Sequence, residues 1–319
     1  MNTNITFLIN KSEITAGTRG ASLGPDAIMT AARQKGSYIF SDNKIEEIRN
    51  WNELLNRPIK YPYAKRIIGL LNVYEELNAK VSSLVKSNTF PIVLAADHGS
   101  AGGTISGIKS AFPDKRIGVV WIDAHADIHT PYTTPSGNLH GMPLASVLDI
   151  DNKECKINDI DAETEEYWNK LKNVGGFSKK INTEDLVYVG VRDTEAGEEF
   201  VIEKFGIKSI EVGQLRKEGV TEILKDINEQ LKDCDIIYVS FDVDSMDPDL
   251  TSYGTGTPVP GGITPNEAKE LLTHFAANPK TVCIEVVEVN PCLDEKKNKM
   301  AEVTLDLLEA ITDVVKERA

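Results

Sequence analysis

The sequence is poor in the features that mark several large classes of protein. It has only four cysteines, none in CxxC spacing or paired with a nearby histidine, so neither a structural zinc site nor a disulfide framework is expected. No apolar run reaches the roughly eighteen residues of a membrane-spanning helix. The first residues also lack the basic and apolar segments of a signal peptide. We therefore expect a cytoplasmic protein with reduced cysteines.

Basic residues are also scarce relative to acidic ones. The chain has 35 Lys and Arg against 49 Asp and Glu, which gives a net charge of −14. This balance argues against a nucleic-acid or membrane partner, and it would draw a small cationic ligand inward as well as favouring solubility. The hydrophobic content of 41% and the charged content of 26% are ordinary for a globular protein.

Short apolar runs alternate with helical patterns along the chain. Runs such as 91–96 and 117–122 are typical of buried strands, whereas 64–85 carries apolar residues at helical spacing. The alternation predicts an α/β fold with three α-β-α layers, in which helices cover both faces of a doubly wound, mostly parallel sheet. No linker or repeat divides the chain, so we expect one domain over 1–319 with a surface insertion at about 150–180.

Side chains that can bind metal follow the predicted strands directly. The carboxyl ends of parallel strands meet at one edge of a sheet, so these groups are expected to converge there. Turn preferences alone would favour aspartate at such places, but they do not explain the histidines. The seven residues expected at this edge are His98, Asp123, His125, Asp127, Asp242, Asp244 and Glu288, and we interpret the two histidines and four aspartates among them as the ligands of a metal site.

The donor types narrow the choice of metal. Nitrogen and oxygen donors without thiolate suit a hard or borderline divalent ion, with Mn²⁺ expected first and Co²⁺, Ni²⁺, Fe²⁺ or Zn²⁺ as alternatives. The aspartates are too many for one catalytic ion. Two ions about 3.5–4 Å apart, sharing carboxylates and a water, are the more economical interpretation.

Several segments resemble the signature motifs of the ureohydrolase family. They are DAHADIHTPYTTPSGNLHG, SFDVDSMDP, TGTPVPGG and EVNP, and the form SGNLHG is similar to the arginase branch in particular. The resemblance covers most of the chain and implies an arginase-like fold. It also implies two manganese ions per subunit and a homo-oligomer, because family members are usually trimers or hexamers.

The resemblance also implies a set of ligands for each ion. In the first set Asp123 and Asp242 act with His98 and Asp127. In the second set the same two aspartates act with one further histidine and one further aspartate, which are His125 and Asp244. Asp123 and Asp242 would therefore bridge the two ions.

The implied reaction is hydrolysis of a guanidino group to urea by a metal-bridging hydroxide, most simply conversion of L-arginine to L-ornithine and urea. The catalytic residues would then be Asp127 beside the nucleophile, His140 as the proton shuttle and Glu288 as the carboxylate that orients the guanidinium. The alternative for His140 is a loop histidine that is hydrogen-bonded to backbone. The alternative for Glu288 is an unrelated glutamate that caps a helix or lies on the surface. His274, on a predicted helix far from the motifs, is interpreted as structural.

Substrate specificity would depend on an outer group of residues. Two of them depart from the arginase pattern: His129 stands in place of an asparagine that serves the substrate carboxylate, and Glu195 in place of an aspartate that faces the α-amino group. His129 could still donate to a carboxylate and Glu195 could still meet an ammonium, or both could mark another substrate. The whole group comprises His129, Ser136, Asn138, Glu195, Glu198 and Thr257.

Two other functions stay open. Another ureohydrolase, of the agmatinase, guanidino-acid hydrolase or formiminoglutamase type, would use the same chemistry, although Ser136 and Asn138 favour a substrate that carries an α-carboxylate. A catalytically idle metal-binding relative is the second alternative. The intact ligand set together with His140 and Glu288 argues against it.

Overall fold

The computed structural model describes residues 3–318, and an eight-stranded sheet with only parallel neighbours lies at its centre. The strand order is β2-β1-β3-β8-β7-β4-β5-β6. The strands are β1 (Asn4–Asn10), β2 (Lys44–Glu47), β3 (Thr89–Ala95), β4 (Ile117–Ile122), β5 (Leu186–Val189), β6 (Lys208–Ile210), β7 (Ile236–Asp242) and β8 (Thr281–Val287).

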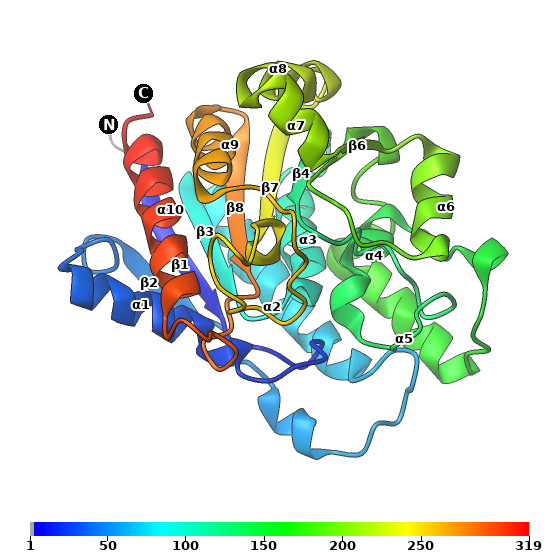
Figure 1. Cartoon of the computed structure of the whole chain (residues 1–319). Helices are drawn as coiled ribbons and strands as arrows, with labels where there is room; N and C mark the ends of the chain where they lie inside the picture. The colour runs from blue at the N-terminus through cyan, green and yellow to red at the C-terminus, as the bar shows by residue number, and fades with distance from the viewer. Residues whose placement is uncertain (1–2, 319) are drawn as a thin grey trace.

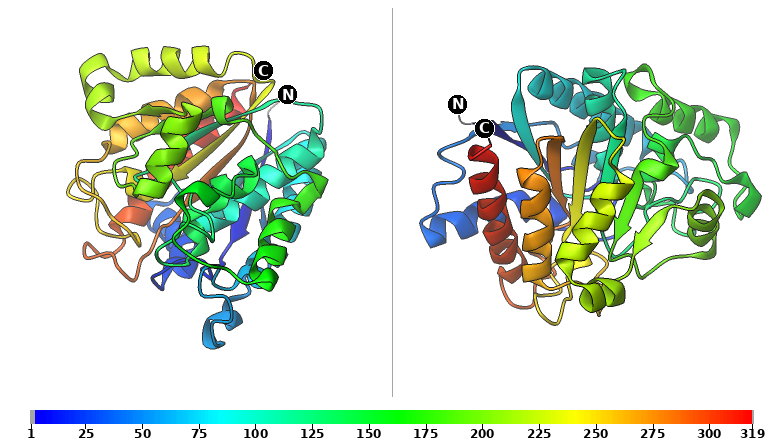
Figure 2. Two further views of the ribbon diagram at one scale, coloured as in Figure 1. Left: turned by 90° about the vertical axis from the view of Figure 1, so that its right-hand side faces the viewer. Right: turned by 90° about the horizontal axis from the view of Figure 1, so that it is seen from above.

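Helices cover both faces of this sheet, as Figures 1 and 2 show. One hydrophobic cluster joins the sheet to α1 and α7–α10, and a second joins it to α2–α6. The three-layer fold predicted from the sequence is therefore confirmed. The helices are α1 (Gly24–Lys35), α2 (Ile67–Lys86), α3 (Ala101–Ala111), α4 (Pro143–Leu148), α5 (Ala162–Lys172), α6 (Ala196–Phe205), α7 (Val212–Glu218), α8 (Val220–Gln230), α9 (Pro265–Ala277) and α10 (Lys299–Lys316).

Strand β4 shows why the central strands read as continuous apolar runs. All of its residues are buried. Val120 and Ile122 pack into the first cluster, whereas Val119 and Trp121 pack into the second. Successive side chains of a strand point to opposite faces, so a strand between two helical layers needs apolar residues at every position.

Strand β2 is the element that the apolar pattern could not indicate. Its sequence is KIEE, its side chains are mostly exposed, and it pairs with β1 at the edge of the sheet. Backbone pairing rather than side-chain burial defines such an edge strand, so hydrophobic alternation gives no signal for it.

The segment 150–180, which we expected to be a surface insertion, contributes buried residues to the second cluster. Trp168 and Leu171 of α5 are 0% and 1% exposed, and α5 packs beside α2. The indole of Trp168 donates to Asp151 Oδ1 over 2.9 Å, and the buried ammonium of Lys172 lies 2.8 Å from the same oxygen. The segment therefore fills part of the layer that lies against α2.

The helices and the cysteines can be compared with the sequence predictions. Within residues 3–318, no helix is both long and apolar enough to cross a membrane. All four cysteines are free, with Cys234 and Cys283 buried in the core.

The burial of Trp168 predicts its contribution to stability. Trp168→Ala should lower the free energy of unfolding by about 3–5 kcal/mol, because it removes a large fully buried ring and leaves Asp151 with one donor fewer. Urea denaturation followed by circular dichroism measures this loss. Tyr38→Ala is the control, since Tyr38 is 73% exposed and its loss should change stability by less than about 0.5 kcal/mol. Equal effects of the two changes would contradict the account.

Candidate metal centre

The candidate site lies at the carboxyl ends of the four central strands. These strands, β3, β8, β7 and β4, are consecutive neighbours, and their ends are level because Val287 pairs with both Ala95 and Asp242. The segment after each strand brings a polar side chain to this edge, as expected for open parallel sheets. The sequence-predicted residues of the metal site, which come from four separate parts of the chain, therefore meet at one place.

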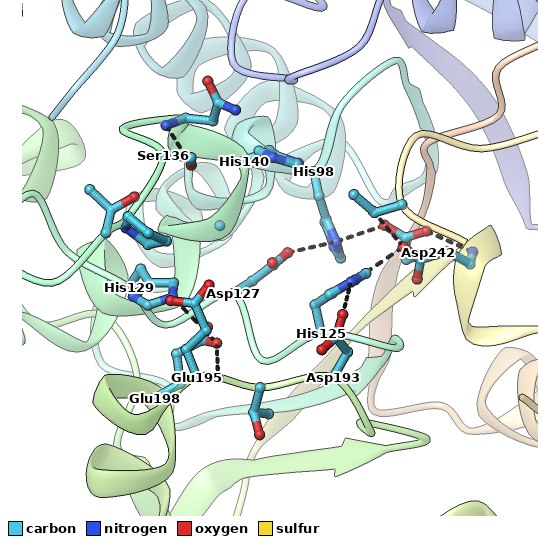
Figure 3. A pocket seen from close by; sticks show the side chains of 17 residues that line it. His98, His125, Asp127, His129, Ser136, His140, Asp193, Glu195, Glu198 and Asp242 are labelled. Atoms are coloured by element: carbon cyan, nitrogen blue, oxygen red, sulfur yellow. Dashed lines mark hydrogen bonds and ion pairs between the residues drawn. The ribbon is translucent and has the colours of Figure 1, made fainter. Parts of the chain in front are cut away.

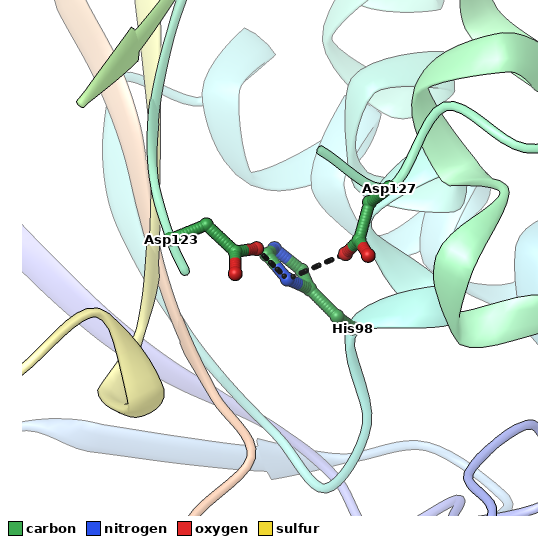
Figure 4. A group of neighbouring side chains, drawn as sticks. All are labelled: His98, Asp123 and Asp127. Carbon is green, nitrogen blue, oxygen red and sulfur yellow. Dashed lines mark ion pairs between the residues drawn. The ribbon is translucent and has the colours of Figure 1, made fainter. Parts of the chain in front are cut away.

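His98 lies at the centre of a first group of carboxylates (Figure 4). Its Nδ1 atom is 2.9 Å from Asp123 Oδ2, 3.1 Å from Asp127 Oδ2 and 3.3 Å from Asp242 Oδ2. All of these side chains are buried, and the ligand atoms of His98, Asp123 and Asp127 lie within 4.8 Å of one another. Such convergence is the geometry required to surround one cation.

His125 forms the centre of a second group, which shares Asp123 with the first. Its Nδ1 atom is 3.1 Å from Asp244 Oδ2 and 3.5 Å from Asp123 Oδ1. Asp123 thus presents one oxygen to His98 and the other to His125. Figure 3 shows the two imidazoles pointing toward the same cluster of carboxylates. A carboxylate that faces both groups has the position of a bridging ligand.

The donor atoms fit divalent metal. His98 Nδ1 is buried and has no hydrogen-bond partner, although three carboxylate oxygens lie within 3.3 Å of it. Such an unpaired buried nitrogen is costly unless a cation lies between it and the oxygens. The set contains imidazole nitrogen and carboxylate oxygen without thiolate, which is the donor chemistry of Mn²⁺ and related ions.

Burial and crowding shift the pKa values of the clustered carboxylates. Burial, and then repulsion from Asp244 and Asp123, raises the pKa of Asp242 well above its usual range. Burial and the charge of Asp123 raise the pKa of Asp127 to about 6. For Asp123 burial also acts upward, but the adjacent imidazoles of His125 and His98 outweigh it and lower the pKa. Bound cations would relieve this repulsion and keep the carboxylates ionised.

Two residues that sequence reasoning missed orient the ligands. Ser240 Oγ lies 2.7 Å from His98 Nε2, so the other ring nitrogen faces the carboxylates. The ring of Trp121 stacks on His98, with 4.0 Å between centroids, and its indole N–H donates to Asp123 Oδ2 over 2.9 Å. Each residue stands two positions before a predicted aspartate ligand. Because side chains two apart share a face of a strand, this spacing was the signal that could have found them.

Glu288 and His140 lie next to the first group. Glu288 Oε1 accepts the main-chain N–H of His98 over 3.0 Å and lies 3.6 Å from His140 Nδ1. Burial opposes protonation of His140, but the neighbouring Glu288 outweighs it and raises the pKa of the imidazole. Asp97 accepts the N–H of Thr15 over 2.9 Å and so ties the loop after β1 to the site.

Two site carboxylates stand on strained backbone. Asp127 and Glu288 have φ values of 49° and 68°, in the left-handed region that non-glycine residues rarely adopt. Such a conformation costs on the order of 1–3 kcal/mol and persists where the surrounding structure holds it, most often at functional sites. Glu288 follows β8 directly, and Asp127 lies in the loop after β4.

A pocket of about 250 Å³ opens beside the two groups and contains all of the predicted substrate-binding residues. Thr257 Oγ1 donates to Asp244 Oδ2 over 3.1 Å, close to the second group. His129 lies 3.3 Å from Glu195 and 3.4 Å from Glu198. Ser136 and Asn138 line another part of the wall, where Ser136 Oγ accepts the N–H of Asn138 over 3.2 Å.

Asp193 is a pocket residue that the motifs did not indicate. It follows β5, its side chain is 65% exposed, and one oxygen lies 3.6 Å from His125 Nε2. The bridge between residues 125 and 193 brings the two segments together. Its position shortly after a predicted strand was the available signal. Fold and donor set together define an α/β protein with a group of side chains at the sheet edge that could hold metal.

The sequence and the fold are similar to those of arginases and their relatives. A model of the Arginase family matches residues 7–312. The arginase of Bacillus caldovelox is 37% identical over 301 residues, which is 91% of either chain. Human Arginase-1 is 35% identical over 243 residues, or 75% of this chain and 69% of the human one. The chain belongs to the arginase family and thus to the ureohydrolases.

Solved structures of arginases and of a related enzyme have the same fold as this chain. An arginase crystal structure from Bacillus subtilis subsp. subtilis str. 168 superposes with a TM-score of 0.80 at 31% identity and covers 98% of both chains. Arginase of Entamoeba histolytica in complex with L-ornithine gives a TM-score of 0.80 at 25% identity, over 99% of both chains. A formimidoylglutamase from Bacillus subtilis, 20% identical over 100% of this chain and 89% of its own, shares the fold with a TM-score of 0.73.

The contact between Ser240 and His98 leads to a prediction about metal affinity. Ser240→Ala should weaken Mn²⁺ binding by about 10–100-fold, because the imidazole loses the bond that orients it. Competition with a fluorescent chelator measures the affinity. The control is Ser106→Ala, since the buried Ser106 hydroxyl donates to Gly102 within α3 and not to the site. If both variants bind Mn²⁺ as tightly as the parent protein, Ser240 does not position the ligand.

Proposed function

We propose that this chain is a manganese-dependent arginase that hydrolyses L-arginine to L-ornithine and urea. The observation that carries the proposal is the sharing of Asp123 between two groups of buried ligands, next to a pocket that also contains His140. The printed names of the relatives support the choice of reaction, since they are arginases. Assembly as a homo-oligomer and a cytoplasmic location belong to the same proposal.

The six predicted ligands divide into two sets. His98 and Asp127 would hold one ion, His125 and Asp244 the other, and Asp123 with Asp242 would face both. Two divalent ions at such a site supply a hydroxide nucleophile near neutral pH, because they lower the pKa of a shared water.

Glu288 is placed to receive the guanidinium group. The N–H of His98 fixes one of its oxygens, and the residue directly follows β8 at the edge of the sheet. A carboxylate can hold a planar guanidinium by charge-assisted hydrogen bonds. A guanidinium held there lies beside the ligand groups, so its carbon can be attacked from their side.

His140 is placed to move a proton. Its imidazole lines the pocket, and Glu288 stabilises its charged form. Expulsion of ornithine requires protonation of an amine, which is otherwise a poor leaving group. A partly exposed imidazole can give this proton and recover another from solvent.

The second candidate function is that of another ureohydrolase. The orientation of the His129 side chain is the observation that favours it. Where the arginase pattern has asparagine, this histidine points to Glu195 and Glu198 rather than to Ser136 (Figure 3). A substrate without a carboxylate would suit that arrangement. Ser136 and Asn138 argue for L-arginine, because they offer donors for a carboxylate.

A urea-release assay tests the proposed reaction. With added Mn²⁺, the protein should release urea from L-arginine and form an equal amount of L-ornithine, and prior chelation should abolish the reaction. The panel includes agmatine, guanidino acids and formiminoglutamate, with formamide as the product measured for the last. Turnover of another member without any of L-arginine would replace the arginase assignment. Absence of turnover with the whole panel would favour a metal-binding relative without activity.

The role of His140 predicts a second result. His140→Asn should lower kcat for L-arginine by about 10²–10⁴-fold, since a general acid is lost. Bound Mn²⁺, measured by mass spectrometry, should stay at the parent level because His140 is not a ligand. His274→Asn is the control, as His274 lies on α9 and bonds to Asn228. A kcat within threefold of the control would remove His140 from the mechanism.

A further inference from the structure

The side chain of Arg192, shortly after β5, donates hydrogen bonds to main-chain carbonyl oxygens of three separate segments. Nε donates one bond, and Nη1 and Nη2 donate two each, so the bonds equal in number the five N–H groups of a guanidinium. The accepting carbonyls belong to Gly190 at 2.9 Å, Asp244 at 2.9 Å, Ser245 at 3.3 Å, Val259 at 2.5 Å and Pro260 at 3.2 Å. The guanidinium therefore joins these segments to one another.

The main chain of Arg192 is bonded to the loop after β4. The N–H groups of Arg192 and Asp193 donate to the carbonyl of Ala124 over 2.9 and 3.0 Å. Ala124 stands directly before the ligand His125, and its own N–H donates to Asp244 Oδ1 over 3.2 Å. Arg192 therefore contacts both parts of the second group of ligands, the loop after β4 through its main chain and Asp244 through its side chain.

The segment 255–262 connects the same guanidinium to the pocket. It lies in the long loop between β7 and α9 (Figure 1) and forms neither helix nor strand. Its sequence, TGTPVPGG, contains two prolines without a main-chain N–H, so it can form few hydrogen bonds of its own. Arg192 binds two of its carbonyls, and Thr257 donates to Asp244 Oδ2 over 3.1 Å. Arg192 thus holds both the main chain of Asp244 and the segment that contacts the Asp244 carboxylate.

The shape of the guanidinium explains why an arginine stands here. It presents five N–H groups in a planar fork, whereas the ammonium of lysine is compact and has three. The segments also approach very closely around it. A Cβ added at Gly262 would lie 2.7 Å from Arg192 Nη2 and 2.3 Å from the carbonyl oxygen of Ser245. The lack of a side chain at Gly262 therefore leaves the space that these bonds need.

We infer that Arg192 is a positioning residue that fixes Asp244 and the segment 255–262, so that ion binding at the second group of ligands depends on it. The inference rests on the two-ion arrangement of the proposed function. The first group should not share this dependence, because His98 follows β3 and its ring is oriented by Ser240 over 2.7 Å.

Replacement of the guanidinium by an ammonium tests the inference. Arg192→Lys keeps the positive charge but has too few donors to join the three segments. It should weaken binding of one Mn²⁺ ion by about 10–100-fold and leave the other within about threefold of the parent protein. Calorimetric titration of the metal-free protein with Mn²⁺ measures both affinities, and electron paramagnetic resonance distinguishes an isolated Mn²⁺ ion from a coupled pair. Two ions bound as tightly as in the parent protein would reject the inference.

Arg318→Lys is the matched control. The guanidinium of the half-buried Arg318 also donates to main-chain carbonyls, to Thr281 over 2.8 Å and to Phe275 over 3.1 Å. Thr281 is the first residue of β8, and the candidate metal centre lies at the other end of that strand. The control variant should therefore lose stability without losing affinity for either ion. Equal metal affinities in Arg192→Lys and Arg318→Lys would contradict the positioning role.

A second pair of variants decides the inference if Arg192→Lys does not fold. Gly262→Ala leaves the arginine in the sequence but places a methyl group where Nη2 forms its bonds. It should also weaken binding of one Mn²⁺ ion by about tenfold or more. Gly213→Ala is its control, because nothing lies within 4 Å of a Cβ added at Gly213. If Gly262→Ala then binds both ions as tightly as this control, Arg192 does not position the second group.

Hydrogen exchange in the metal-free protein separates the inference from the proposed function. The N–H of Ile263 donates to the carbonyl of Ser245 over 3.0 Å, and the N–H of Asp247 donates to the carbonyl of Ile263 over 2.9 Å. These amides lie beside the segments that Arg192 joins, so Arg192→Lys should speed their exchange at least about tenfold. If the parent protein binds fewer than two Mn²⁺ ions, the two-ion arrangement fails and exchange alone decides the inference. Unchanged exchange at both amides would then overturn it.

Discussion

The structure depends on a concentration of buried negative charge at the centre of one sheet edge. Asp123, Asp127, Asp242 and Asp244 are at most 7% exposed and converge on His98 and His125. Charges removed from water at such short separations are unfavourable unless cations or protons compensate them. The raised pKa values of Asp127 and Asp242 express this cost. Divalent ions would compensate these charges and, in the proposed function, would also give the cluster its chemical use.

The sheet holds the clustered carboxylates close together, and the loops beyond it line the pocket. Four adjacent parallel strands end level with one another, and the core on both faces holds them in register. Trp121 and Ser240, on the buried strands, contact the imidazole of His98, whereas the loops beyond carry His129, His140 and Glu195 to the wall of the pocket. The loops that line the pocket can therefore change while the cluster at the sheet edge stays the same.

Much of this could be predicted from the sequence, and the reasons are physical. Buried parallel strands are recognisable in the sequence as apolar runs. A polar residue that directly follows such a run lies at the carboxyl edge of the sheet. His98, Asp123 and Asp242 could therefore be predicted to lie close together. Hydrogen-bond direction is not encoded in any spacing, so the turn of His129 toward its glutamates required the structure. Hydrophobic periodicity did not indicate the exposed edge strand β2 or the burial of Trp168. Both features depend on tertiary contacts, which local sequence patterns do not describe.

The central claim is that Asp123 lies between two metal ions. Crystals grown with Mn²⁺ and measured at the manganese absorption edge test it most directly. We expect two anomalous peaks per chain, about 3.5–4 Å apart. One should lie beside His98 and Asp127, the other beside His125 and Asp244, and Asp123 should contact both. Fully occupied crystals with a single peak, or with peaks that do not touch Asp123, would contradict it.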